Sequence, residues 1–223
     1  MIAWLAPGDP PANFPPVERA LREPSGLLAA GGDLSYERLI AAYRRGIFPW
    51  YSPGQPVLWW SPDPREVLFP HEFHRSRSLA RALRSRGFEY HVDRDFEAVL
   101  RACAAPRALS PGTWITAEMH AAYLELHRRG VAHSAEIWRA GRLVGGVYGV
   151  QLGRVYFGES MFSVERDASK AALDGLVRQG LKEGLALIDC QLPSAHLRSL
   201  GSRAIPRAQF LALLAQALEE RAR

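Results

Sequence analysis

The sequence is poor in cysteine and has no long apolar run. Only Cys103 and Cys190 occur in 223 residues, and nothing near them has the spacing of a disulfide framework or a metal site. No apolar stretch approaches the roughly 18 residues that a membrane span needs. The first residues also lack the basic segment and apolar stretch of a signal peptide. We therefore expect a cytoplasmic protein that does not bind a membrane.

Common nucleotide- and metal-binding motifs are missing as well. The chain has no Gly-x-x-x-x-Gly-Lys-Ser/Thr loop, no Gly-x-Gly-x-x-Gly turn and no His-Glu-x-x-His pair. Residues 162–170 should join a strand to a helix, and they lack the glycine-rich turn with which acetyltransferases hold the pyrophosphate of coenzyme A. We predict no metal, no bound cofactor and no acyl-coenzyme A donor.

Lysine is scarce, because 26 of the 28 basic residues are arginines. The net charge is +5, and residues 73–87 alone hold five arginines and no acidic residue. The five are Arg75, Arg77, Arg81, Arg84 and Arg86. Three of them share one face of an expected helix, at i, i+4 and i+7, where like charges repel weakly. That face is either a solvated surface or a site for a polyanion such as nucleic-acid phosphate.

Proline is concentrated at one end, with 12 of the 16 prolines in residues 1–70. This excludes a segment built mainly from long helices and central strands. One helix is expected there, with Ser35 as its N-cap and Gly46 at its end. We predict a small Pro-rich N-terminal domain at residues 1–63 and a larger catalytic domain at residues 64–223. An aromatic cluster follows this helix and either packs these domains together or stacks on a nucleobase. Its members are Phe48, Trp50, Tyr51, Trp59 and Trp60.

The remaining chain alternates between helical and strand patterns. Helices are expected at 75–86, 95–103, 117–129, 167–183 and 207–222, with Thr116 as a cap. Strands are expected at 89–92, 134–138, 143–150, 154–158 and 185–191, and glycine-containing connections of hairpin length predict an antiparallel meander for the middle three. This is an α+β pattern. It is compatible with the acyltransferase fold of the N-acetyltransferase superfamily.

Two short segments carry carboxylates in apolar surroundings. Glu159 stands at an expected strand end between aromatic residues, where it is either a salt-bridge partner or a catalytic or ligand-binding group. Asp189 and Gln191 follow a buried strand, and on a regular strand they project to one side while Cys190 faces away. This pair either caps the next turn or orients and deprotonates a substrate.

Several segments together are specific enough to indicate a family. In chain order they are LLAAGGDLS (27–35), RRGIFPW (44–50), WWSPDPR (59–65), GTWIT (112–116), HSAEIW (133–138), VGGVYG (144–149), GESMFS (158–163), ASK (168–170), LIDCQ (187–191) and SLG (199–201). With these segments the chain closely resembles the bacterial leucyl/phenylalanyl-tRNA–protein transferases over roughly residues 20–210.

The resemblance implies an activity and a fold. The enzyme would move Leu or Phe, and less well Met, from aminoacyl-tRNA to the α-amino group of a protein that begins with Arg or Lys. The added residue would mark that protein for degradation. The resemblance also implies an acetyltransferase-like (GNAT) core after a small N-terminal domain. Because the donor is an activated ester, the reaction requires neither ATP nor a metal.

The resemblance also implies roles for individual residues. Asp189 and Gln191 would handle the proton of the reaction, and Glu159 would bind the cationic acceptor. Alternatively, a ribose hydroxyl of the tRNA carries the proton and these side chains only orient the substrates. Trp50 and Trp114 would hold the terminal adenosine and the aminoacyl end. The remaining assignments are an amino-acid pocket formed by Tyr156, Val147, Ile188, Ser160 and Phe162, and a grip on the tRNA acceptor stem by Arg75, Arg77, Arg81, Arg84 and Arg86. Tyr156 stands where relatives are expected to have Phe.

Two other functions stay open at this point. One is an acetyltransferase-like enzyme that uses acyl-coenzyme A, against which the missing pyrophosphate turn argues. The other is an RNA-binding module without catalysis. That module would explain the arginines and aromatic residues but would leave Glu159, Asp189 and Gln191 without a role.

Overall fold

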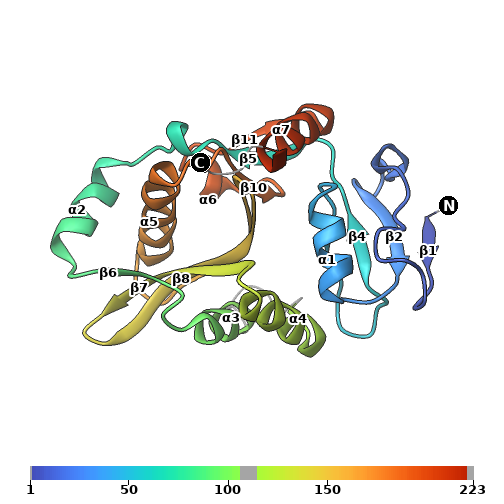
Figure 1. The fold of residues 1–223 in the computed structure, drawn as a ribbon. Coiled ribbons are helices and arrows are strands. Elements are labelled where there is room, and N and C mark those ends of the chain that lie inside the picture. Colours follow the sequence, from blue (N-terminus) through green and yellow to red (C-terminus); the bar gives the residue numbers. More distant parts are fainter. Residues whose placement is uncertain (1, 106–114, 220–223) are drawn as a thin grey trace.

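The computed structural model of the protein describes residues 2–105 and 115–219 (Figure 1). Its strands form two sheets, one of four strands within the first 60 residues and one of seven strands from residue 65 onward. Helices cover both faces of the larger sheet. The predicted α+β class is confirmed. Within the described ranges, no helix is long and apolar enough to cross a membrane.

The small sheet consists of strands of two to five residues. In pairing order they are β1 (Ala3–Leu5), β2 (Leu27–Gly31), β4 (Leu58–Trp60) and β3 (Phe48–Pro49). Pro49 lies in the edge strand β3, where proline is tolerated. These strands were not predicted, because segments this short show no measurable alternation.

Helix α1 (Tyr36–Tyr43) begins and ends as the sequence predicts. The Ser35 hydroxyl accepts a hydrogen bond from the Arg38 amide at 3.4 Å, and Gly46 adopts a φ of +69°. Arg38 donates to the Asp9 carbonyl at 2.9 Å, and Arg45 donates to the Phe14 carbonyl at 3.0 Å. These two arginines therefore hold the Pro-rich N-terminal arm, residues 7–16, against the helix. No role for this arm could be predicted from the sequence.

The large sheet contains the predicted meander. In pairing order its strands are β11 (Arg203–Ile205), β5 (Arg65–Leu68), β10 (Leu187–Gln191), β9 (Val155–Ser163), β8 (Arg142–Leu152), β7 (Ala132–Arg139) and β6 (Glu89–Val92). Strands β7, β8 and β9 pair antiparallel in sequence order, as predicted, and β6 extends the meander by pairing antiparallel with β7. Strands β5 and β11 were not predicted, and β5 inserts between two strands from the end of the chain.

Six further helices occur along the chain, and the five other than α6 lie at predicted positions. They are α2 (Arg77–Ser85), α3 (Phe96–Ala104), α4 (Ala117–Arg128), α5 (Ala168–Lys182), α6 (Ala195–Arg198) and α7 (Arg207–Glu219). The Thr116 hydroxyl accepts from the Met119 amide at 3.2 Å, which confirms it as the cap of α4. Along β8 the side chains alternate between the two layers: Val147 packs with α5, and Tyr148 packs against Tyr123 of α4.

Strands β9 and β10 run parallel and then separate. Pairing joins Leu187 through Asp189 to Val155 through Phe157, and it stops there. Strand β9 continues to Ser163 on its β8 side, whereas it was expected to end near residue 158. Glu159 therefore lies within a strand and not at its end. The separation leaves both strands free to line a cavity.

Candidate active site

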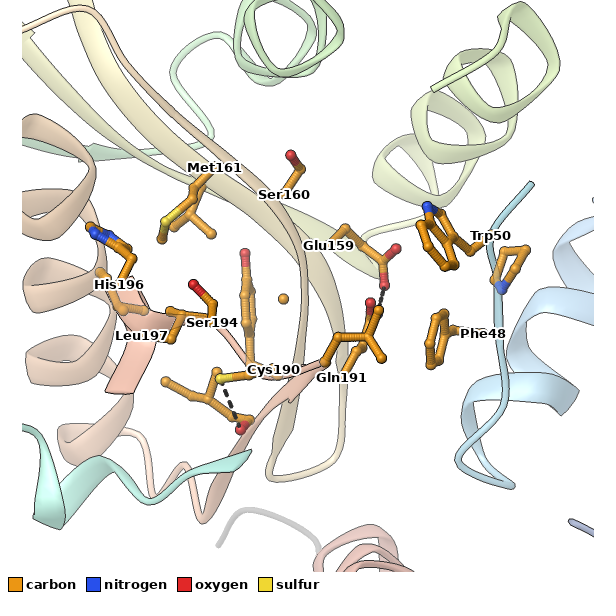
Figure 2. Close-up of a pocket in the computed structure, with 17 residues that line it drawn as sticks. Phe48, Trp50, Glu159, Ser160, Met161, Cys190, Gln191, Ser194, His196 and Leu197 are labelled. Atoms are coloured by element: carbon orange, nitrogen blue, oxygen red, sulfur yellow. Dashed lines mark hydrogen bonds between the residues drawn. The ribbon is translucent and has the colours of Figure 1, made fainter. Parts of the chain in front are cut away.

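A cavity of about 340 Å³ lies where β9 and β10 separate. Phe48 and Trp50 of the N-terminal segment bound one side of it, and His196 and Leu197 of α6 bound the opposite side (Figure 2). The volume is in the range of small-ligand sites. The cavity thus lies between the first 60 residues and the last 40, with the two strands as its floor.

Most of the predicted amino-acid pocket is found here. Val147, Tyr156, Ile188 and Ser160 all line the cavity, joined by Met161 and Leu173. The Tyr156 hydroxyl donates to the backbone carbonyl of His133 at 3.0 Å, so its polar atom is already bonded and the ring contributes an apolar surface.

Phe162 is not brought into this cavity. It belongs to the hydrophobic core that also contains Val99 and Phe96 of α3, on the other face of β9. The pleat of the strand explains why Met161 lines the cavity and Phe162 does not, because neighbouring residues of a strand face opposite sides.

Glu159 is the acidic group in the wall of the cavity. Its carboxylate accepts hydrogen bonds from the hydroxyls of Tyr43 at 2.8 Å and Tyr123 at 2.6 Å. It also accepts one from the Gln191 side-chain amide at 2.8 Å (Figure 2). No cation of the described residues forms an ion pair with it. Burial raises the pKa of Glu159 to about 7, although the three hydrogen bonds oppose that rise.

The two tyrosines and Glu159 form a closed ring of oxygen atoms. The Tyr43 and Tyr123 hydroxyls are also 2.6 Å from each other, so three groups share three short contacts. An ionised carboxylate leaves two hydroxyl protons for these three contacts, whereas a protonated one supplies the third proton. When Glu159 is ionised, both hydroxyl protons point to its carboxylate, and these two hydrogen bonds stabilise the anion.

Asp189 and Gln191 do not project together, and that expectation is wrong. Both Asp189 oxygens accept from Arg65, at 2.7 and 2.6 Å, and the aspartate is fully buried outside the cavity lining. Gln191 has a φ of +63°, and the pairing with β5 shifts register between the two residues. This bulge turns the Gln191 side chain into the cavity toward Glu159.

The same bulge brings Cys190 to the cavity wall, where it was expected to face away (Figure 2). Burial raises the pKa of its thiol well above the usual range, so the thiol stays protonated. A protonated thiol is a poor nucleophile. Its place in the wall is that of an apolar side chain.

The structure describes one of the two tryptophans that were expected to hold the terminal adenosine and the aminoacyl end. Trp50 lies at the cavity and is 41% exposed, with its ring centroid 5.5 Å from that of Trp60. The Trp60 indole N–H donates to the Trp50 carbonyl at 2.6 Å. Trp114 lies outside the described residues.

The five predicted tRNA-binding arginines fall into two groups. Arg75 binds the buried carboxylate of Asp174 at 2.5 Å, and Arg86 donates to the Arg166 carbonyl at 3.0 Å. The other three lie exposed on α2, and the described part of the chain offers them no acidic partner. These are Arg77, Arg81 and Arg84.

The sequence did not reveal Tyr43, Tyr123 or the partner role of Arg65. Tyr43 is separated along the chain from Tyr123 by 80 residues and from Glu159 by 116. Helical periodicity indicates a buried face but not which hydroxyl meets which carboxylate. Arg65 stood in a matching segment without an assigned role.

Comparisons with known sequences agree on one family. The sequence model described as "Leucyl/phenylalanyl-tRNA protein transferase" matches residues 67–215, and the one described as its N-terminal domain matches residues 32–63. A leucyl/phenylalanyl-tRNA–protein transferase of Pseudomonas aeruginosa (strain LESB58) is 59% identical over 210 residues, covering 94% of this chain and 92% of the relative. One from Pseudomonas entomophila (strain L48) is 58% identical over 220 residues, with coverages of 99% and 96%. Among solved structures, a GCN5-related N-acetyltransferase from Kribbella flavida has a TM-score of 0.38 and 11% identity, covering 74% of this chain and 59% of that one.

Proposed function

This chain belongs to the leucyl/phenylalanyl-tRNA–protein transferase family of aminoacyltransferases, and we propose that it moves Leu or Phe, and less readily Met, onto proteins that begin with Arg or Lys. The donor is aminoacyl-tRNA and the acceptor is the α-amino group. We propose further that the added residue marks the protein for degradation and that the reaction takes place in the cytoplasm. One observation carries the proposal: Glu159, with a pKa of about 7, stands between an apolar cavity and an exposed tryptophan.

The reaction requires a proton to move. The amine nitrogen attacks the ester carbonyl carbon, the C–N bond forms, and the bond from that carbon to the ribose oxygen breaks. One proton leaves the nitrogen and one reaches the ribose oxygen. An α-amine has a pKa of about 8, and a base with a pKa near 7 can take its proton and return it. The oxygen ring around Glu159 supports this role, because the hydrogen bonds from its two hydroxyls oppose the effect of burial and keep the pKa of Glu159 near that value.

We propose that Gln191 orients the amine together with Glu159, and that Asp189 holds Gln191 in place. The Gln191 amide reaches Glu159 at 2.8 Å from inside the cavity. Both oxygens of Asp189 are bound by Arg65, and the side chain does not reach the cavity, so a proton-accepting role is not supported. If the ribose hydroxyl carries the proton instead, Glu159 and Gln191 still orient the amine.

The donor's amino-acid side chain would occupy the apolar part of the cavity. Val147, Ile188 and the ring of Tyr156 offer surface suited to Leu, Phe or Met. Trp50, which lines the cavity and is 41% exposed, would stack on the terminal adenosine.

The tRNA stem would lie against the exposed arginines of α2. Guanidinium groups bind phosphate in bidentate fashion and without reading sequence. We also propose that the chain divides functionally at residues 63 and 64. The first part then supplies the adenosine side of the cavity, and the second supplies the reacting groups.

The proposal is tested by incubating the protein with Leu-tRNA and a peptide that begins with Arg. Mass spectrometry should detect one added leucine at the peptide's N-terminus. A peptide that differs only by an N-terminal Ala is the matched control, and acetyl-coenzyme A replaces Leu-tRNA in a second control. No addition would overturn the transfer activity, equal addition to the Ala peptide would overturn the acceptor preference, and acetylation would favour the acyl-coenzyme A alternative.

A further inference from the structure

Arg65 lies at the junction of three parts of the molecule. It is 1% exposed, and its fork binds both oxygens of Asp189. Its guanidinium carbon is 4.8 Å from the ring centre of Phe48 in the N-terminal segment and 4.7 Å from that of Phe210 in α7. One planar cation therefore contacts the cavity wall, the end of β10 and the C-terminal helix at once.

Asp189 passes this hold to the cavity. Its Oδ1 atom, bound by Arg65, also accepts the backbone N–H of Gln191 at 2.9 Å. That contact closes the turn in which Gln191 takes its left-handed backbone conformation. A residue other than glycine keeps this backbone conformation only where the surrounding structure enforces it. This turn in turn directs the side-chain amide of Gln191 toward Glu159.

We propose that Arg65 is a positioning residue for aminoacyl transfer: through Asp189 it sets the Gln191 amide against Glu159, and through Phe48 it sets the wall beside them. The inference rests on the proposed function. Arg65 does not line the cavity, so it acts only through these neighbours.

Stability alone does not account for this arrangement. A buried ion pair contributes little more to stability than a well-packed apolar pair of the same volume. The Arg65 Nη1 atom is also buried without a hydrogen-bond partner among the described residues. What the arginine supplies, and an apolar side chain does not, is a rigid fork that fixes the orientation of the Asp189 carboxylate.

The test compares two identical substitutions at two equally buried arginines. Arg65→Lys keeps the charge and loses the fork. Arg38→Lys does the same at a residue that is also 1% exposed but binds Asp9 and Asp33 of the N-terminal arm. We expect both variants to have a similarly lowered Tm. For Arg65→Lys, we expect kcat to fall about 10- to 100-fold with KM for both substrates within about threefold, because small misplacements of reacting groups have effects of this size. For Arg38→Lys, kcat should stay within about threefold.

A second variant separates positioning from charge balance. Arg65→Met with Asp189→Asn removes both charges and keeps an acceptor for the Gln191 N–H, so its Tm should exceed that of Arg65→Met alone. Its kcat should remain low, because the carboxamide is no longer held by a fork. A double variant with normal kcat, or an Arg65→Lys variant no slower than Arg38→Lys, overturns the proposal.

A crystal structure of the Arg65→Lys variant provides a readout that does not depend on transfer. The 2.8 Å contact between Gln191 and Glu159 should be lost or lengthened. If this contact keeps its length in the variant, the inference is overturned, whether or not the protein without substitutions carries out transfer. The absence of transfer by the unchanged protein overturns the proposed function instead.

Discussion

Replacing Tyr123 with phenylalanine should raise the pKa of Glu159 and move the acid limb of the transfer rate to higher pH. The Tyr123 hydroxyl donates to the Glu159 carboxylate at 2.6 Å, and this hydrogen bond lowers the pKa of Glu159 from the value that burial alone would give. Without the donor, the anion loses more stabilisation than the neutral acid does. The pKa therefore rises above its present value of about 7.

The size of the shift follows from the difference between the two protonation states. A hydrogen bond to a charged group is worth about 1.5–3 kcal/mol and one between neutral groups about 1 kcal/mol. The difference, about 1–2 kcal/mol, corresponds to about one pKa unit. At pH 7 the ionised fraction of Glu159 would fall from about one half to about one tenth, so kcat/KM should fall about fivefold there. Above pH 9 the two proteins should converge.

The assay is the pH dependence of kcat/KM for an Arg-starting peptide in the unchanged protein and in Tyr123→Phe. Titration of the peptide amine is common to both, so the difference between the two profiles reports the enzyme group. Tyr148→Phe is the matched control, because the Tyr148 hydroxyl is buried beside Tyr123 without a hydrogen-bond partner among the described residues. Coincident profiles for Tyr123→Phe and the unchanged protein, or an equal shift in Tyr148→Phe, would refute the role given to the oxygen ring.

Three further predictions concern other parts of the site. Glu159→Gln should abolish transfer yet stabilise the fold by about 1–3 kcal/mol at pH 8 and hardly at pH 4. The reason is that the raised pKa of Glu159 makes the unchanged protein lose stability as pH rises from about 4.5 to about 7. Urea unfolding at both pH values measures this gain, and a gain that is independent of pH contradicts the reasoning. Asp189→Asn leaves Arg65 buried without its counter-ion, so the unfolding free energy should fall by about 3 kcal/mol while aminoacyl-tRNA binding persists in the folded protein; full stability in urea and full activity would remove Asp189 from the account. A triple charge reversal on α2 should weaken tRNA binding and reduce the slope of log affinity against log salt by about two to three, and unchanged affinity at low salt in a filter-binding assay would mean that this face is only solvated. The reversed residues are Arg77, Arg81 and Arg84.

The parts of the fold that depend on local signals were predictable. Helix α1 follows from a serine cap and a terminal glycine, and the meander follows from alternation interrupted by glycine turns. Strand β5 was not predictable, because four residues between prolines show no pattern and its pairing partners lie far along the chain.

The bulge at Gln191 shows the same limit within the site. LIDCQ reads as an ordinary strand, and an ordinary strand places Asp189 and Gln191 on one side. The observed conformation depends on Arg65, which is 124 residues away from Asp189. The tyrosines of the oxygen ring were hidden for the same reason, since their common partner is separated from Tyr43 by 116 residues. Periodicity identifies buried faces, and the contacts between those faces are decided by the whole fold.

The position of β5 between β10 and β11 also has a consequence for synthesis on the ribosome. Strand β5 leaves the ribosome roughly 120 residues before β10, which at about 5–20 residues per second means a delay of about 6–24 s. During that time Arg65 has no carboxylate to bind, and Phe48 has no opposite wall. A nascent chain therefore cannot complete the cavity until β10 and α6 have been made, long after its Phe48 wall has left the ribosome.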